Sequence, residues 1–164
     1  MQRWKFRSIE TANLLNPAFC CAVLASSIVG YSIGDSEGLP FVLSFITLPI
    51  VLHKPTRDLL PITSRTSLAG WLENNPKARI QFFERVLSLK PFVRESILFG
   101  MSHHWLILER GNLKSTISNS RITNYASRMA GDTKACITRA KILGKWFFAA
   151  GSPEMVMALW EIKP

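Results

Sequence analysis

Two long uncharged runs constrain the fold of this chain more than any other feature. No charged side chain occurs from Thr11 to Gly34, and a second uncharged run extends from Gly38 to Leu52. A membrane-spanning helix needs about 20 consecutive apolar residues. The first run is interrupted by polar residues such as Asn16, and Pro40 and Pro49 interrupt the second. We therefore expect two buried apolar helices in a cytoplasmic protein, and no membrane insertion.

Proline signals delimit these two helices. Asn16-Pro17 combines a capping side chain with a proline in the first turn, which predicts a helix from Pro17 to about Tyr31. The second helix is expected from Leu39 to Leu48, because Pro49 lacks the N–H that would continue it.

The segment from Leu48 to Asp58 separates the apolar first third of the chain from the charged remainder. Its two prolines restrain the backbone, so we expect a rigid loop. Such a corner either locks the N-terminal helices onto the rest of the domain or docks a partner. The candidate residues of this corner are His53, Lys54, Thr56, Arg57 and Arg65.

Downstream, the apolar spacing predicts three helices over 64–74, 76–89 and 91–104, then a strand, a turn and a strand that end at residue 115. The expected inner faces are Leu68, Trp71 and Leu72 in the first helix, Ile80, Phe83, Val86 and Leu87 in the second, and Val93, Ile97, Leu98 and Met101 in the third. This order favours a winged-helix-like region over about 64–116, although three helices and a hairpin also pack in other ways. Residues 115–131 are expected to form a loop before C-terminal helices over 132–162.

The expected fold class is mainly α with a small β-hairpin, in which a winged-helix-like core is preceded by two buried apolar helices. At 164 residues the chain is expected to form one domain over 13–164, preceded by an N-terminal arm over 1–12. Three cysteines in apolar surroundings do not make a disulfide framework. Cys20, Cys21 and Cys136 are therefore expected to be buried free thiols.

The net charge of +9 is concentrated in one segment. Between Arg110 and Lys145 there are eight basic residues and one acid, Asp132. A local positive field of this kind suits DNA phosphates or an acidic protein face, and a solvated helix surface is the third alternative. The candidate contact residues are Arg110, Lys114, Arg121, Arg128, Lys134, Lys141 and Lys145.

Catalytic patterns are sparse. A hydrolytic or phosphate-handling site built from the His53–Asp58 corner and the hydroxyls of Ser64, Thr66 and Ser67 is one hypothesis, but a structural corner or a partner contact is favoured. Adjacent His103 and His104 make a poor chelating pair, since helical metal ligands sit four residues apart. We expect no enzyme activity, no cofactor and no metal.

Two strings resemble a known family. His53-Lys54-Pro55-Thr56-Arg57 and Leu143-Gly144-Lys145-Trp146-Phe147 are specific, whereas Asn16-Pro17, Arg65-Thr66-Ser67-Leu68 and Gly151-Ser152-Pro153 add weaker support. In these strings the chain resembles the small middle component of bacterial three-component ABC-ATPase systems, the group that includes the third subunit of Lamassu-type antiphage defence. The resemblance covers residues 13–164.

The resemblance implies a non-catalytic scaffold or regulatory subunit of an antiphage or anti-plasmid defence complex. Such a subunit joins an SMC-like coiled-coil ABC ATPase to an effector, commonly a nuclease, and the complex senses foreign double-stranded DNA. It also implies a small helical fold with winged-helix character. The alternative is a free-standing basic winged-helix module that binds DNA by itself.

Overall fold

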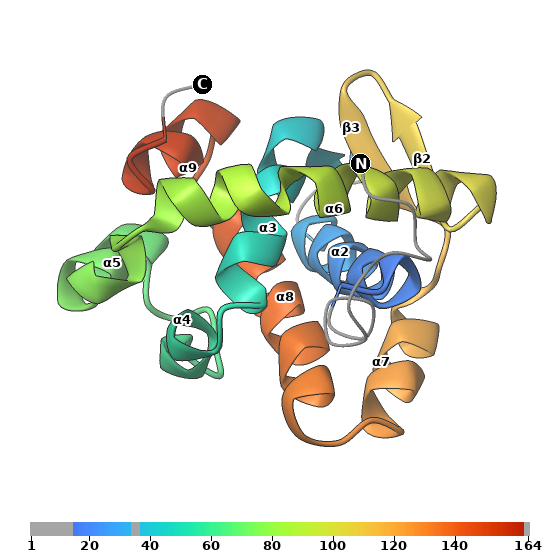
Figure 1. Ribbon diagram of the computed structural model, residues 1–164, viewed down its shortest axis with the longest axis horizontal. Coiled ribbons are helices and arrows are strands. Elements are labelled where there is room, and N and C mark those ends of the chain that lie inside the picture. Colours follow the sequence, from blue (N-terminus) through green and yellow to red (C-terminus); the bar gives the residue numbers. More distant parts are fainter. Residues whose placement is uncertain (1–14, 34–36, 163–164) are drawn as a thin grey trace.

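The computed structural model describes residues 15–33 and 37–162, which are mainly helical with one small antiparallel sheet (Figure 1). In chain order the elements are α2 (Pro17–Tyr31), β1 (Leu39–Pro40), η2 (Phe41–Leu43), α3 (Ser44–Val51), α4 (Lys54–Leu59), α5 (Leu68–Asn74), η3 (Pro76–Arg79), α6 (Phe82–Ser102), β2 (Leu106–Glu109), β3 (Asn112–Ser115), α7 (Asn119–Ser127), α8 (Gly131–Ala149) and α9 (Pro153–Leu159). The predicted N-terminal arm over 1–12 lies outside the described residues.

Helix α2 lies at the centre of the molecule, and the prediction of its bounds is confirmed. The side chain of Asn16 accepts a hydrogen bond from the backbone N–H of Ala18 at 2.9 Å, and Pro17 opens the first turn. Ten of its 15 residues are buried. A helix covered on nearly all sides needs no amphipathic pattern, which explains the uncharged run that contains it.

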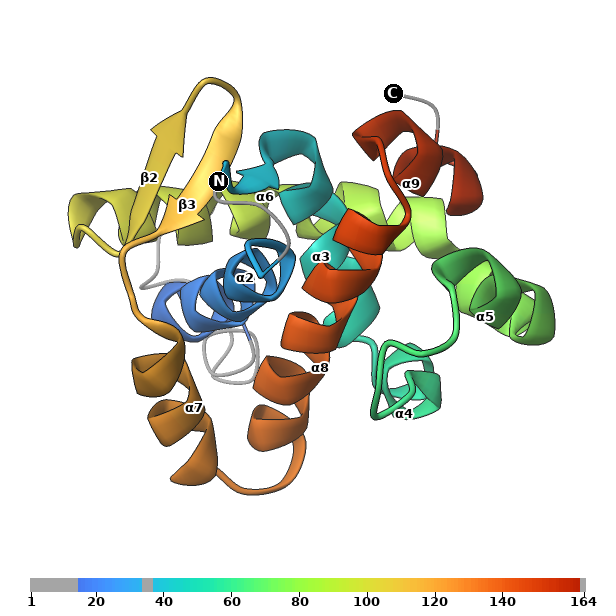
Figure 2. The ribbon, with the colours of Figure 1, turned by 180° about the vertical axis from the view of Figure 1, so that it is seen from behind.

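Helices α2 and α8 lie beside each other in both views, and the second half of α2 packs against the middle of α8 (Figure 1, Figure 2). The contact is close because two glycines lie in it. A Cβ atom on Gly30 would overlap the carbonyl oxygen of Lys141, and one on Gly144 would overlap that of Ser27. The hydroxyl of Ser26 donates a hydrogen bond to the carbonyl of Ile137 at 2.7 Å across this interface.

The predicted helix from Leu39 to Leu48 is wrong at both ends. Leu39 and Pro40 form strand β1, and α3 begins only at Ser44. Leu39 pairs with Leu113 of β3, the central strand of the sheet, so this residue belongs to a strand and not to a helix. At the other end α3 continues through Pro49 to Val51. This helix has only eight residues, and one missing N–H near its end costs it a single hydrogen bond.

The two helices predicted over 76–89 and 91–104 are also wrong. A short 3-10 turn, η3, precedes one continuous helix of 21 residues, α6, with Pro91 in its interior. Val93 and Ile97 are buried as predicted. Residues on both sides of Pro91 pack against the core, and this packing offsets the hydrogen bond that the proline removes. In Figure 1 α6 runs across the face of the molecule from α5 to the sheet.

The hairpin is confirmed, but it belongs to a sheet of three strands in the order β1-β3-β2. Arg110 and Gly111 form its turn with φ angles of 48° and 80°, the pair of positive values that a tight hairpin requires. The loop predicted over 115–131 is wrong, because Ser118 caps helix α7 within it. The winged-helix-like arrangement is not confirmed, since one long helix precedes the hairpin where two were expected.

The C-terminal elements follow their sequence signals. Helix α8 buries Cys136, Ala140, Leu143 and Phe147, the stripe that its spacing indicates. The hydroxyl of Ser152 caps α9 through the N–H of Met155 at 3.3 Å. A cluster of Trp71, Trp146, Trp160 and Phe82 joins α5, α8, the residue directly after α9, and α6. Over the described part of the chain, no helix combines the length and apolar character needed to cross a membrane.

Candidate functional site

The predicted corner consists of two helices joined by a tight bend, where a loop was expected. Helix α3 ends at Val51, and after two connecting residues α4 starts at Lys54, with Pro55 in its first turn. A proline is tolerated there because a first-turn N–H has no partner within the helix. The Nδ1 atom of His53 lies 2.7 Å from the hydroxyl of Thr56, a buried side chain, so these two residues brace the bend.

Arg57 is the most constrained residue of the corner, with 3% of its surface exposed. Its Nη1 group donates to the carbonyl oxygen of Val51 at 3.2 Å, at the last turn of α3. The same group lies 3.2 Å from the Sγ atom of Cys136 on α8. One guanidinium on α4 therefore fastens α3 and α8 together.

An ion-pair network covers this guanidinium on its outer side. Nη2 of Arg57 lies 3.0 Å from an Oδ1 atom of Asp132, which also accepts from Lys54 at 3.1 Å. Lys54 reaches Asp58 at 3.2 Å. The hydrogen bond from Lys54 and the charge of Arg57 lower the pKa of Asp132 below its ordinary value. Two bases and two acids thus balance one another.

A cleft of about 640 Å³ lies beside the corner, lined by His53 and Arg57 and, across from them, by Arg85 of α6. Burial and the charge of Arg85 lower the pKa of His53, so its imidazole is neutral near pH 7. Arg85 itself caps the turn before α6, since it donates to the carbonyl oxygens of Ile80 at 2.6 Å and Ala78 at 2.9 Å.

The hydroxyl residues named in the catalytic hypothesis have other contacts. Ser67 caps α5 through the N–H of Gly70 at 3.1 Å, and the carbonyl of Thr66 accepts a bond from the indole of Trp146 at 2.7 Å. Arg65 is exposed in the connection between α4 and α5, and no polar contact among the described residues joins it to the corner. In the structure His53 contacts Thr56, and Lys54 and Arg57 both bind Asp132, whereas Arg65 lies outside these contacts.

The predicted basic residues are spread over the hairpin, α7 and α8. Arg110, Arg121, Arg128 and Lys134 are exposed, and none of them forms an ion pair with another described residue. The remaining three differ. Lys114 pairs with Glu109 at 2.8 Å, and Lys141 donates to the side-chain oxygen of Asn119 at 2.6 Å. Burial and the charge of Lys145 lower the pKa of Lys141, so this side of α8 is only partly solvated.

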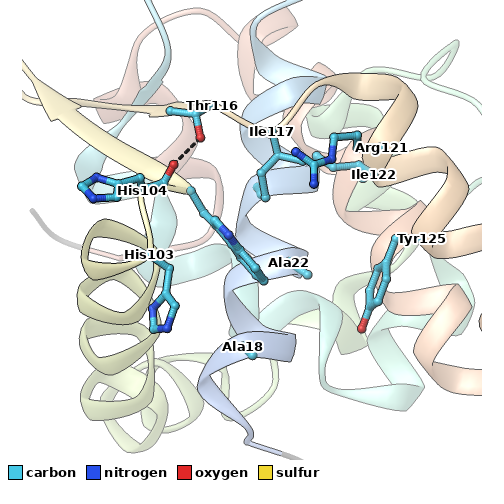
Figure 3. A pocket seen from close by; sticks show the side chains of 11 residues that line it. Ala18, Ala22, His103, His104, Thr116, Ile117, Arg121, Ile122 and Tyr125 are labelled. Atoms are coloured by element: carbon cyan, nitrogen blue, oxygen red, sulfur yellow. Dashed lines mark hydrogen bonds between the residues drawn. The ribbon is translucent and has the colours of Figure 1, made fainter.

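A second cavity, of about 420 Å³, opens between α2, the end of α6 and α7 (Figure 3). Its floor is made by Ala18, Ala22 and Ala25 of α2, and Trp105 and Tyr125 are among its walls. The cavity was not predicted from the sequence, because one of its walls is α7, a helix in the segment that was expected to be a loop. The signal that was overlooked is Ser118, a capping residue followed by Ile122 and Ala126 at helical spacing.

Helix α6 carries exposed apolar side chains that were predicted to be buried. Phe83, Leu87 and Leu98 expose 52%, 51% and 66% of their surfaces, and Met101 exposes 39%. At 100° per residue these positions fall on one stripe of the helix, with the bases Lys90 and Arg94 between the two apolar pairs. The prediction failed because it divided this segment into two helices at Pro91, so the stripe shared by residues 83–101 was not recognised.

Asp132, Cys136 and Arg85 are the contact residues that sequence reasoning missed. Asp132 was noted as the single acid of the basic segment but not as a contact residue, and the partners of Arg57 and His53 come from helices far away in the sequence. Within residues 15–33 and 37–162 no group of three or more His, Cys, Asp or Glu side chains is arranged to hold a metal ion. The three cysteines are buried free thiols, as predicted.

Both specific strings meet at α8. Arg57 of the first string contacts Cys136 of α8. In the second string, Gly144 allows the close approach of α2, and Trp146 donates a hydrogen bond to the connection between α4 and α5. A family model for the ABC-three component (ABC-3C) system Middle Component 3 matches residues 4–164. No curated protein and no solved structure was found to match. Since the family model covers nearly the whole chain, this protein belongs to the Middle Component 3 family of ABC-three component systems.

Proposed function

We propose that this chain is a non-catalytic scaffold subunit that binds the other components of its ABC-three component system. Membership in a middle-component family supports a role within a multi-subunit assembly. The observation that carries the proposal is the stripe of Phe83, Leu87, Lys90, Arg94, Leu98 and Met101, which we call the α6 stripe.

The α6 stripe has the dimensions of a helix-binding surface. From Phe83 to Met101 it extends about 27 Å, at the 1.5 Å rise of an α-helix. The opposite side of α6, with Val93 and Ile97, is buried in the core, so the helix is held rigidly. Exposed apolar pairs at the two ends of one rigid stripe, with two bases between them, suit the spaced anchors of an amphipathic partner helix.

The partner that fits is a coiled-coil subunit. A helix of an SMC-like ABC ATPase presents apolar side chains at regular spacing, and acidic residues near its middle would meet Lys90 and Arg94. The second partner is an effector, commonly a nuclease, which the complex restrains until foreign DNA is detected. In this proposal the chain takes part in antiphage or anti-plasmid defence and works in the cytoplasm.

Co-expression with the two neighbouring gene products tests the scaffold role. The tagged chain is expected to co-purify with a coiled-coil ATPase. In the double variant Phe83→Ser/Leu87→Ser, the amount of ATPase recovered is expected to fall at least tenfold. Ile62→Ser is the matched control, because Ile62 is 79% exposed but lies outside the stripe. A chain that purifies alone with both neighbours present would contradict the proposal.

A second candidate function is contact with DNA phosphates. Arg110, Arg121, Arg128 and Lys134 are exposed and unpaired within the described residues, and they belong to adjoining elements of one chain segment. Phosphate contact needs charge at the surface and no base-reading side chains. This function is compatible with a scaffold, and it would be the main one if the chain were a free-standing DNA-binding module.

A further inference from the structure

We propose that the cavity between α2, α6 and α7 binds a nucleotide, with the base against Trp105 and Tyr125 and the phosphate at Arg121. This inference goes beyond the scaffold role, since none of the α6 stripe residues lines the cavity. The chemistry required is a planar aromatic ring that bears an anionic group. A free nucleotide and a nucleotide within a single strand both supply it.

The floor of the cavity suits a flat ligand. Ala18, Ala22 and Ala25 are four and three residues apart, so their methyl groups lie on one face of α2. Larger side chains at these positions would fill the space. The volume of about 420 Å³ lies in the range typical of small-molecule pockets.

Two aromatic side chains border this floor. Trp105 is held from behind by Phe99, whose ring packs edge-on at 5.6 Å between centroids. Its backbone N–H is fixed by the carbonyl of Gly100 at 2.7 Å. Tyr125 projects from α7 on the other side of the cavity from His103, near Ala22 (Figure 3), and 39% of its surface is exposed. Stacking on aromatic faces is how proteins hold single-stranded bases of any sequence.

The rim of the cavity favours an anion. Arg121 extends over the cavity from α7 (Figure 3) and forms no ion pair with a described residue. His103 and His104 lie at the opposite rim, and no acidic side chain occurs among the described residues that line the cavity. A guanidinium pairs with phosphate through two parallel hydrogen bonds. Bases in duplex DNA are stacked inside the helix, so the cavity selects unpaired nucleotides.

Calorimetric titration of the whole purified chain tests the site. The probes are a twelve-residue oligothymidylate, the same strand with abasic sugars throughout, and thymidine monophosphate. Oligothymidylate is expected to bind at least tenfold more tightly than the abasic strand. If the monophosphate binds as tightly as the oligomer, the site takes free nucleotides, and if only the oligomer binds, it takes single strands. Equal affinity for the two strands, or no binding of any probe, would overturn the proposal.

Matched variants separate the base contact from general charge. Tyr125→Ala and Arg121→Gln are each expected to weaken oligothymidylate binding about tenfold, while Tyr125→Phe retains it because the ring remains. Arg128 is an exposed base of the same segment that does not line the cavity. Arg128→Gln is therefore expected to weaken the binding of both strands by the same small factor. Unchanged oligothymidylate binding in Tyr125→Ala would contradict the nucleotide site. A loss of ATPase co-purification would concern the scaffold role alone.

Discussion

At the scale of single residues, the two specific strings are explained by contacts that hold α8 in place. Arg57 is buried with its charge balanced by Asp132, and Gly144 leaves room for the backbone of α2. Both contacts reach partners more than 70 positions away in the sequence. Of the two hypotheses for the corner, these contacts favour the lock over the docking surface.

Replacement of Arg57 tests the lock. Arg57→Ala is expected to lower the free energy of unfolding by about 3 kcal/mol, because it empties the buried space of the side chain and removes its hydrogen bond to the carbonyl oxygen of Val51. Lys54→Ala is the control, since this exposed lysine touches the carboxylate of Asp132 and its loss should change the stability little. Urea unfolding followed by circular dichroism measures both. An Arg57→Ala protein of normal stability that no longer assembles would favour docking instead.

Replacement of Gly144 tests the close contact between α2 and α8. Gly144→Ala places a methyl group against the carbonyl of Ser27, so the helices must separate, at a cost of about 1–3 kcal/mol. Gly70→Ala is the matched control within a helix, because its methyl group meets only the Ser67 hydroxyl at 3.2 Å. The thermal midpoint should fall clearly in the first variant and little in the second. Equal midpoints would contradict the proposed role of Gly144.

At the scale of elements, the capping signal at Asn16 predicted a helix start correctly, whereas the start predicted at residue 64 was four residues early because Ser67 is the cap. Prolines predicted helix ends badly. Asn16 and Ser152 satisfy N–H groups of their own helix, a local effect that tertiary structure does not alter. Pro49 and Pro91 each remove one hydrogen bond, a cost of a few kcal/mol at most that the burial of neighbouring residues offsets. Packing therefore decides whether a helix continues through a proline.

Burial of α2 and α8 predicts that the three thiols are inert in the native protein. Burial raises the pKa of Cys20 and of Cys21 to about 12 and also raises the pKa of Cys136. Since the thiolate is the reactive form, a disulfide reagent at pH 8 should modify none of them until the chain unfolds. In guanidinium chloride all three should react. Rapid reaction of one thiol in the native state would show that its helix opens locally.

At the scale of the whole molecule, the exposed basic residues are spread over the hairpin, α7 and α8, while the α6 stripe supplies the apolar surface. The two surfaces support different partners, phosphates for the first and a protein helix for the second. The net charge of +9 predicted an anionic partner but not its place. Folding divides the basic residues into four exposed ones, two whose side chains bind a neighbour, and Lys145, which is half-buried.

The salt dependence of duplex binding tests the basic surface. If about four phosphates are contacted, the logarithm of affinity falls with a slope of about −3.6 against the logarithm of salt concentration. The double variant Arg128→Gln/Lys134→Gln should reduce that slope by about two. Lys77→Gln/Lys90→Gln removes two exposed bases elsewhere and should leave the slope unchanged. If the first variant had the same slope as the unaltered protein, Arg128 and Lys134 would be solvated surface residues without phosphate contacts.

The sequence by itself determined the helical class, the central helix α2, the hairpin, the buried stripe of α8 and the family to which the two strings point. These follow from short-range causes: capping side chains, turn residues and apolar periodicity. Only the tertiary structure decided that α6 passes Pro91 unbroken, that α7 replaces a loop, and that Asp132 and Cys136 meet Arg57. Each of these depends on packing between distant segments, whose free energy no local pattern of residues contains.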